Sequence, residues 1–298
     1  MTQIRANGID IEYDEAGPQE GVPFLFINGF GTQMTGWPDE FRRALTDAGL
    51  RFIRFDNRDV GLSQKFTGVV PQKGSPPPYK LADMASDAAG LLDALGIASA
   101  HIAGCSMGGM IAQLVALDHP EKTRSLISIF STTSDPSLPP SAPEAQAALT
   151  TRPPSNERAD VVAHSLKGRR TYASTRWPFD EDRLGELVGR NYDRSYYPEG
   201  TTRHWSAILA GPPRTERLKG LAVPTLVLHG SADTLIRPEA GRHTAQCIPD
   251  AEYHEIEGWG HDMPLPAIPE VSGVILDFVE RVEASNSPAA AKLARSTA

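Results

Sequence analysis

Short apolar segments alternate with helical segments along this chain. This alternation restricts the possible fold classes more than any other feature of the sequence. Several apolar segments have the length of buried strands, namely residues 23–27, 52–55, 101–103, 126–130 and 225–228. Between them, residues 83–95 carry apolar side chains at helical spacing, and residues 107–117 form a helical segment of small residues. An Asn7-Gly8 pair near the start predicts a β-hairpin. Strands that alternate with helices predict an α/β fold with a mostly parallel, doubly wound sheet.

The alternation is interrupted in the middle of the chain. Residues 131–218 are rich in Pro and Arg and carry helical fragments. A segment inserted between two core strands is best interpreted as a cap over the functional site. We therefore expect an α/β core of residues 1–130 and 219–284, an inserted helical cap of residues 131–218, and a flexible tail of residues 285–298.

Charge and hydropathy restrict the partners of the protein. The 298 residues include 29 Lys and Arg against 37 Asp and Glu, a net charge of −8. Without a basic block, nucleic acid and anionic membrane are poor candidate partners. No apolar run approaches the roughly 20 residues that a membrane span needs. The first residues show no secretory signal, so we expect a cytoplasmic protein. The sequence leaves a homodimer open.

The sharpest catalytic motif is Gly104-Cys105-Ser106-Met107-Gly108. It follows a predicted strand and opens a predicted helix, which is the context of a nucleophile elbow. A serine in this tight turn has unfavourable backbone angles, and side chains two residues away on either side would collide with the turn. The alternative is a structural serine in a chance turn, but the strand-to-helix context favours Ser106 as a nucleophile.

A serine nucleophile needs a base, and the base needs an acid that orients it. Asp233 follows a predicted strand by a short loop, and His261 lies in a later glycine-rich turn. Taken singly, each could be an ordinary loop residue. The order Ser106, Asp233, His261 in three separate elements favours a triad. His229 is the nearest rival base, but it ends the strand that delivers Asp233, and the rival acid Asp262 adjoins His261.

An oxyanion hole requires two backbone N–H donors. Met107 should supply one, because it directly follows the nucleophile. The loop Asn28-Gly29-Phe30-Gly31 follows the first apolar strand, and Phe30 is the expected second donor. The alternative for this loop is an ordinary glycine turn.

The motifs together resemble the α/β-hydrolase superfamily. The segments that carry the resemblance are residues 28–31, 55–63, 104–109 and 258–264. Residues 36–41, 54–63 and 116–120 are similar to the aclacinomycin methylesterase group, which hydrolyses a methyl ester on an anthracycline. The resemblance implies triad roles for Ser106, Asp233 and His261, and oxyanion roles for Phe30 and Met107. Two positions depart from the usual pattern: Asn28 replaces the common histidine, and Asp59 stands where glycine is frequent.

These residues predict a serine hydrolase that cleaves carboxylic esters through an acyl-enzyme on Ser106. Its partner would be a small-molecule ester, and the triad chemistry requires no metal and no cofactor. A lactonase, a C–C hydrolase and a cofactor-free perhydrolase stay open on the same triad, as does a non-catalytic ligand receptor of the same fold. Haloalkane dehalogenases and epoxide hydrolases are disfavoured, because they place aspartate at the elbow.

We expect the substrate pocket to be lined by residues near the catalytic loops and in the cap. The candidates are Gly29, Trp37, Trp205, Trp259 and Met263. The alternative for the aromatic residues of the cap is that they pack it onto the core.

Overall fold

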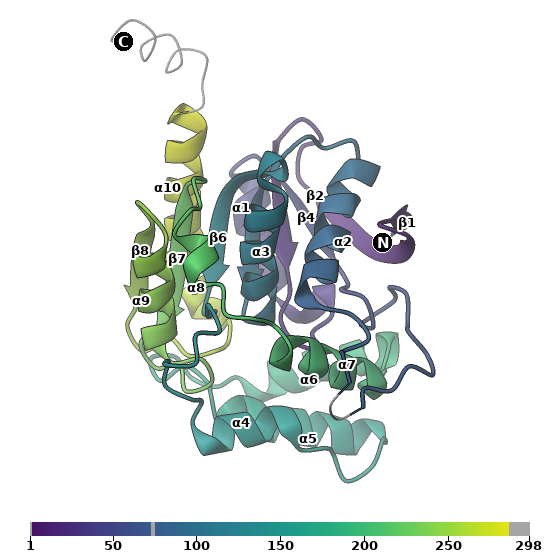
Figure 1. Cartoon of the computed structure of the whole chain (residues 1–298). Helices are drawn as coiled ribbons and strands as arrows, with labels where there is room; N and C mark the ends of the chain where they lie inside the picture. The colour runs from purple at the N-terminus through teal and green to yellow at the C-terminus, as the bar shows by residue number, and fades with distance from the viewer. Residues whose placement is uncertain (1, 73–74, 286–298) are drawn as a thin grey trace, which may run out of the picture.

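One β-sheet forms the centre of the molecule (Figure 1). The computed structural model describes residues 2–72 and 75–285. Within them, eight strands pair in the order β1-β2-β4-β3-β5-β6-β7-β8. The strands are β1 (Thr2–Ala6), β2 (Ile9–Ala16), β3 (Val22–Ile27), β4 (Leu50–Phe55), β5 (Ala100–Cys105), β6 (Thr123–Ile129), β7 (Thr225–Gly230) and β8 (Glu252–Ile256). The β1–β2 and β2–β4 pairs are antiparallel, and all other neighbours in the sheet are parallel.

The N-terminal hairpin forms as the sequence predicts. β1 and β2 are joined by a turn of two residues, Asn7 and Gly8. Both residues have positive φ, 46° and 76°. Two successive positive φ angles are typical of the tight hairpin turn whose twist matches that of the strands, and Asn-Gly adopts it readily.

Helices cover both faces of the sheet. One face carries α2 (Leu81–Ala94), α3 (Met107–Asp118), α8 (Thr215–Leu218) and α9 (Pro238–Cys247), and the other carries α1 (Asp39–Asp47) and α10 (Ile268–Ser285). Short 3₁₀ turns lie at η1 (Met34–Gly36), η2 (Pro120–Lys122) and η3 (Leu265–Ala267). In β3, Leu25 and Ile27 pack toward α2 and α3, while Phe24 and Phe26 pack toward α1 and α10. Successive strand residues thus serve two cores, as expected for a parallel sheet covered on both sides.

The remaining helices lie between β6 and β7 in the chain. These cap helices are α4 (Pro143–Thr150), α5 (Arg158–Arg170), α6 (Glu181–Arg194) and α7 (Pro198–Leu209), and Figure 1 shows them together beyond one end of the sheet. α5 packs on both α4 and α6, whereas α8 packs on the core helices α3 and α9. The division into a core of residues 1–130 and 219–284 and a cap of residues 131–218 stays a prediction. The predicted tail, apart from Ser285 at the end of α10, lies outside the described residues.

The sheet brings the predicted functional residues to one edge. β5 ends directly before Ser106, while β7 and β8 end shortly before Asp233 and His261. Carboxyl ends of parallel strands meet at the same edge of a sheet, where α/β folds place their functional loops. The predicted α/β fold, mostly parallel and doubly wound with inserted helices, is confirmed. Among the described helices, none combines the length and the apolar character that a membrane crossing requires.

Candidate active site

Ser106 occupies a strained turn between β5 and α3. Its backbone angles are φ 57° and ψ −123°, which a residue with a side chain rarely adopts and which must be held by the surrounding structure. The flanking glycines allow the turn to close. A Cβ on Gly104 would lie 2.1 Å from the carbonyl oxygen of Gly108, and a Cβ on Gly108 would lie 2.1 Å from that of Ile27. Neither glycine can be replaced unless the backbone moves.

Asp233 and His261 form a hydrogen-bonded pair. The Nδ1–H group of His261 donates to Oδ2 of Asp233 over 2.6 Å. The other carboxylate oxygen, Oδ1, accepts the backbone N–H groups of Leu235 and Ile236 at 2.8 and 2.9 Å. A carboxylate on Nδ1 fixes the tautomer of the ring and leaves Nε2 free to accept a proton.

The environment keeps Asp233 ionised. Burial alone would raise the pKa of this carboxyl group, but the charge of His261 and hydrogen bonds from both histidines outweigh it and lower the pKa to about 2. The second histidine is His229, whose Nε2 lies 3.5 Å from Oδ2 of Asp233 and 2.8 Å from the carbonyl oxygen of Ile236. His229, the rival base, therefore lies behind the acid and contacts the loop of Asp233.

Residues after α5 hold the turn that carries His261. The backbone N–H of His261 donates to the carbonyl oxygen of Tyr172 over 2.7 Å. The hydroxyl of Ser174 accepts the N–H of Gly260 over 3.0 Å and donates to Asp262. Asp262, the rival acid, is thus bound to Ser174 and does not orient His261. A segment that lies next to the cap helices fixes the histidine turn.

The glycine loop after β3 runs directly past Ser106. A Cβ on Gly29 would lie 3.2 Å from Cβ of Ser106 and 3.7 Å from its Oγ. In the described part of the chain, the backbone N–H of Phe30 donates to no protein acceptor, and the same is true of Met107, the first residue of α3. The glycine loop and the start of α3 therefore leave two free N–H donors near Ser106, and the one from Met107 lies at the positive end of a helix.

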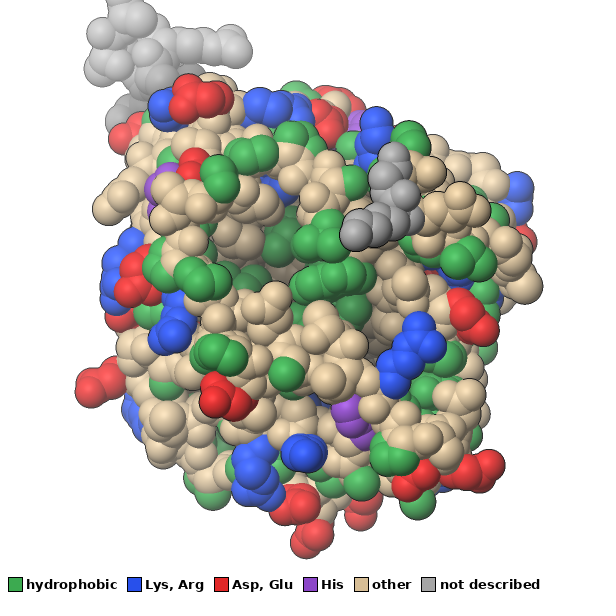
Figure 2. Space-filling model, turned by 60° about the horizontal axis from the view of Figure 1, so that its bottom comes forward, with side chains coloured by type: hydrophobic (Ala, Val, Ile, Leu, Met, Phe, Trp, Pro, Cys, Tyr) green, Lys and Arg blue, Asp and Glu red, His purple; other side chains and the backbone are tan. Residues whose placement is uncertain are grey.

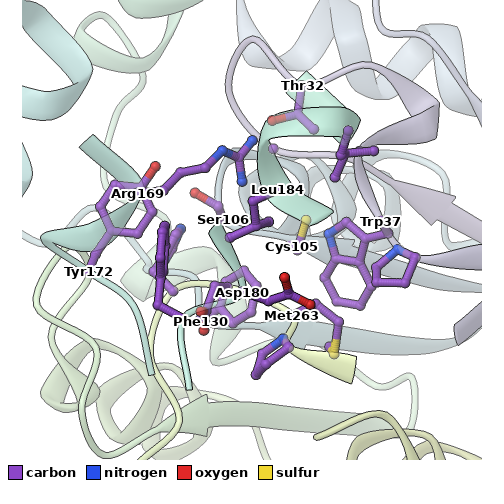
Figure 3. Close-up of a pocket in the computed structure, with 18 of the residues that line it drawn as sticks. Thr32, Trp37, Cys105, Ser106, Phe130, Arg169, Tyr172, Asp180, Leu184 and Met263 are labelled. Carbon is purple, nitrogen blue, oxygen red and sulfur yellow. The ribbon is translucent and has the colours of Figure 1, made fainter. Parts of the chain in front are cut away.

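Ser106 and His261 open onto one cavity of about 300 Å³ (Figure 3). Their side chains make no hydrogen bond to each other in this structure, although Asp233 already orients the ring. Such contacts are often long before substrate binds. Gly29, Trp37 and Met263 line the same cavity, as the sequence suggests. Figure 2 shows hydrophobic side chains around a hollow on the face formed by the cap helices.

Two of the expected pocket residues do not line this cavity. Trp259 is fully buried, packs edge-on against Phe130 with ring centroids 5.1 Å apart, and donates its indole N–H to the carbonyl oxygen of Asp262. Trp205 packs edge-on against Phe30 at 5.8 Å, behind the glycine loop. Trp259 therefore packs beneath the turn of His261 and Trp205 behind the loop of Phe30, and the expectation that they line the substrate pocket does not match their positions.

His204 of α7 supports the glycine loop and carries no motif that would reveal it. Its Nδ1 accepts the N–H of Gly31 over 3.4 Å, and its Nε2–H donates to the carbonyl oxygen of Arg58 over 2.8 Å. The ring is fully buried, and burial lowers its pKa to about 4. A neutral His204 therefore links α7 to the loop that holds Phe30.

The neighbouring Arg203 anchors α7 to the core through Asp59. Its Nε and Nη2 atoms lie 2.7 and 2.9 Å from the two carboxylate oxygens. Asp59 also accepts the hydroxyl of Tyr79 and the N–H of Phe66. Asp59 is the position where glycine is frequent in the superfamily. The sequence shows that Asp59 is unusual, but its partner Arg203 lies 144 residues away in the chain and is revealed only by the structure.

The chain is similar to known proteins over most of its length. Residues 22–266 match the family described as alpha/beta hydrolase fold. The chain is 30% identical to rhodomycin D methylesterase of Streptomyces sp. (strain C5), over 84% of this chain and 88% of that protein. It is 30% identical to 2-hydroxymuconate semialdehyde hydrolase of Pseudomonas putida, over 96% of each. A solved thermophilic esterase from Thermogutta terrifontis matches with a TM-score of 0.70 and 26% identity, over 94% of this chain and 98% of that one.

The family match covers both the elbow of Ser106 and the turn of His261. The resemblance to methylesterases that the sequence indicates is confirmed by the relatives. With the sheet order and the strand-end loops described above, these findings show that the chain belongs to the α/β-hydrolase fold family.

Proposed function

We propose that this protein is a serine hydrolase that cleaves carboxylic esters through an acyl-enzyme on Ser106. The observation that carries the proposal is that the strained serine turn opens onto the same cavity as His261, whose ring is oriented by the buried Asp233. A serine at the elbow, an oriented imidazole and unpaired N–H groups are the parts that acyl transfer needs. Relatives named as a methylesterase and an esterase support a carboxylic ester as the substrate.

The proposed mechanism uses these parts in order. His261 Nε2 takes the proton of the Ser106 hydroxyl while its oxygen attacks the ester carbonyl carbon. Asp233 stabilises the imidazolium, and the N–H groups of Phe30 and Met107 hold the negative oxygen of the tetrahedral intermediate. His261 then gives its proton to the departing alcohol. Water, deprotonated by the same ring, hydrolyses the acyl-enzyme and releases the acid.

The mechanism is tested by steady-state hydrolysis of p-nitrophenyl acetate and of methyl esters. Ser106→Ala should lower kcat by about 10⁴-fold or more, because the other groups cannot replace the nucleophile. Ser137→Ala is a matched control, since Ser137 is exposed and its side chain hydrogen-bonds to Asp135, away from both cavities. Near-normal turnover by Ser106→Ala would refute the proposal. A wild-type protein that binds but does not turn over any ester or lactone would favour the receptor alternative.

A further inference from the structure

A second cavity of about 340 Å³ adjoins the catalytic one. The two share wall residues from the glycine loop and from the cap, namely Phe30, Thr32, Leu149, Arg169 and Tyr172. A molecule bound at Ser106 can therefore contact residues that also line the second cavity. The polar groups on the shared wall determine which chemical groups of a ligand can bind there.

Arg169, the next-to-last residue of α5, is a cation on this wall that has no ion-pair partner in the part of the chain that the structure describes. Its Nε donates to the hydroxyl of Ser165 over 3.3 Å. Within the described residues, no carboxylate lies within 4.0 Å of its guanidinium group. Figure 3 shows the guanidinium group directed into the cavity on the side of Ser106. Its forked donors are thus available to a ligand.

The two acids that line the cavity of Ser106, Asp180 and Asp262, make their bonds to other groups. Asp180 accepts the N–H of Arg183 as the cap of α6 and pairs with the guanidinium of Arg183 at 3.6 Å. Asp262 binds Ser174, and burial raises the pKa of its carboxyl group. Neither acid forms an ion pair with Arg169, although the positive charge of Arg169 acts on Asp262 from beyond ion-pair distance.

Two neighbours strengthen the preference for an anion. Tyr172 lines both cavities, and within the described residues its hydroxyl makes no hydrogen bond. Burial raises the pKa of this phenol, so it stays a neutral donor. Arg152 lines the second cavity and also has no carboxylate within ion-pair distance in the described chain. A protein of net charge −8 thus places one guanidinium group without an ion-pair partner among the described residues on the wall of the cavity that Ser106 lines, and another on the wall of the adjoining cavity.

We propose that the substrate is an ester that also bears a free carboxylate, and that Arg169, with the hydroxyl of Tyr172, binds this carboxylate at the junction of the two cavities. The proposal deepens the ester-hydrolase function proposed above and rests on it. A planar guanidinium group matches a carboxylate with two parallel hydrogen bonds, which gives orientation as well as attraction. Arg169 is then a specificity-determining residue.

The test compares charged and neutral esters of similar length. Methyl hydrogen glutarate with methyl hexanoate places the charge on the acyl side, and 4-acetoxybutanoate with pentyl acetate places it on the alcohol side. Wild-type protein should hydrolyse at least one charged ester with the higher kcat/KM. Arg169→Met should lower kcat/KM for that ester about 30-fold and for its neutral counterpart less than about threefold.

Lys167→Met is the matched control, because it removes one positive charge from the same helix at an exposed position outside both cavities. This variant should leave the ratio of charged to neutral kcat/KM unchanged. Equal losses on charged and neutral esters in Arg169→Met would overturn the proposal, and so would no loss on either. Turnover of the neutral ester within about threefold of the wild-type value shows that Arg169→Met is folded.

Failure of the ester-hydrolase function itself would appear differently, as no turnover of any ester by the wild-type protein. Calorimetry of glutarate binding then tests independently whether Arg169 binds a carboxylate. Binding to wild type that weakens about tenfold in Arg169→Met, but not in Lys167→Met, supports the site. Absence of binding to wild type, or equal binding to wild type and Arg169→Met, overturns it.

Discussion

The buried ion pair between Arg203 and Asp59 should be among the most sensitive points of the structure. Asp59 is fully buried and Arg203 is 2% exposed, so water cannot solvate either charged group. In Arg203→Met, Asp59 keeps its hydrogen bonds from Tyr79 and Phe66 but loses its counter-charge. Removal of one partner from a buried pair costs about 3–5 kcal/mol. We expect the free energy of unfolding to fall by this amount at pH 7.

The loss should depend on pH in a defined direction. Burial alone would raise the pKa of Asp59, but Arg203 and the other donors lower it below its ordinary value. The wild-type carboxylate therefore stabilises the fold above the pKa of the unfolded chain, about 3.9, and loses this contribution as the pH falls further. In Arg203→Met the pKa of Asp59 rises. Asp59 of the variant therefore becomes protonated as the pH falls, and the cost of its unpaired buried charge disappears. The difference in free energy of unfolding between wild type and Arg203→Met should therefore decrease from pH 7 toward pH 5.

Urea denaturation at pH 7 and pH 5 measures both effects. Asp59→Asn combined with Arg203→Met should be more stable than Arg203→Met alone, since the double variant no longer buries an unpaired charge. Arg5→Met removes an exposed partner of Asp10 on the hairpin, and should leave the free energy of unfolding unchanged within error. A loss below about 1 kcal/mol in Arg203→Met, or a gap that widens on acidification, would refute this reasoning.

Three further variants test the loops around the catalytic residues. Gly108→Ala should cost at least about 2 kcal/mol in urea denaturation, because its Cβ would collide with the carbonyl oxygen of Ile27; a wild-type midpoint would contradict the close packing of the elbow against β3. Asp233→Asn should reduce kcat about 10⁴-fold with little change in KM, since the amide favours the wrong tautomer of His261; a loss under about tenfold would count against the triad. Ser174→Ala should lower kcat about tenfold at unchanged KM by loosening the histidine turn, whereas a change in KM alone would contradict a positioning role.

The elements that carry the elbow could be predicted because their signals are local. Alternating strands and helices, Asn7-Gly8 in the hairpin, and glycines on both sides of Ser106 each follow from a few adjacent residues. The order of Asp233 and His261 after strands of the same sheet brings them to one edge, and their hydrogen bond follows from that topology.

The supporting contacts could not be predicted because they join distant parts of the chain. The partner of Asp59 lies 144 residues away, and His204 contacts the glycine loop across 173 residues. An aromatic residue near a catalytic loop can also face either side of it. Trp37 lines the cavity, whereas Trp259 is buried in the core, although each directly follows a glycine in the sequence.

The most direct test of the proposed mechanism is mass spectrometry after reaction with an alkyl fluorophosphonate, which traps an activated serine. The wild-type protein should gain one adduct on the peptide that contains Ser106, and Ser106→Ala should gain none. His261→Ala should react far more slowly, because the Ser106 hydroxyl then has no base. An adduct on another residue, or turnover of esters by a protein that the reagent leaves unlabelled, would contradict the assignment of Ser106 as the nucleophile.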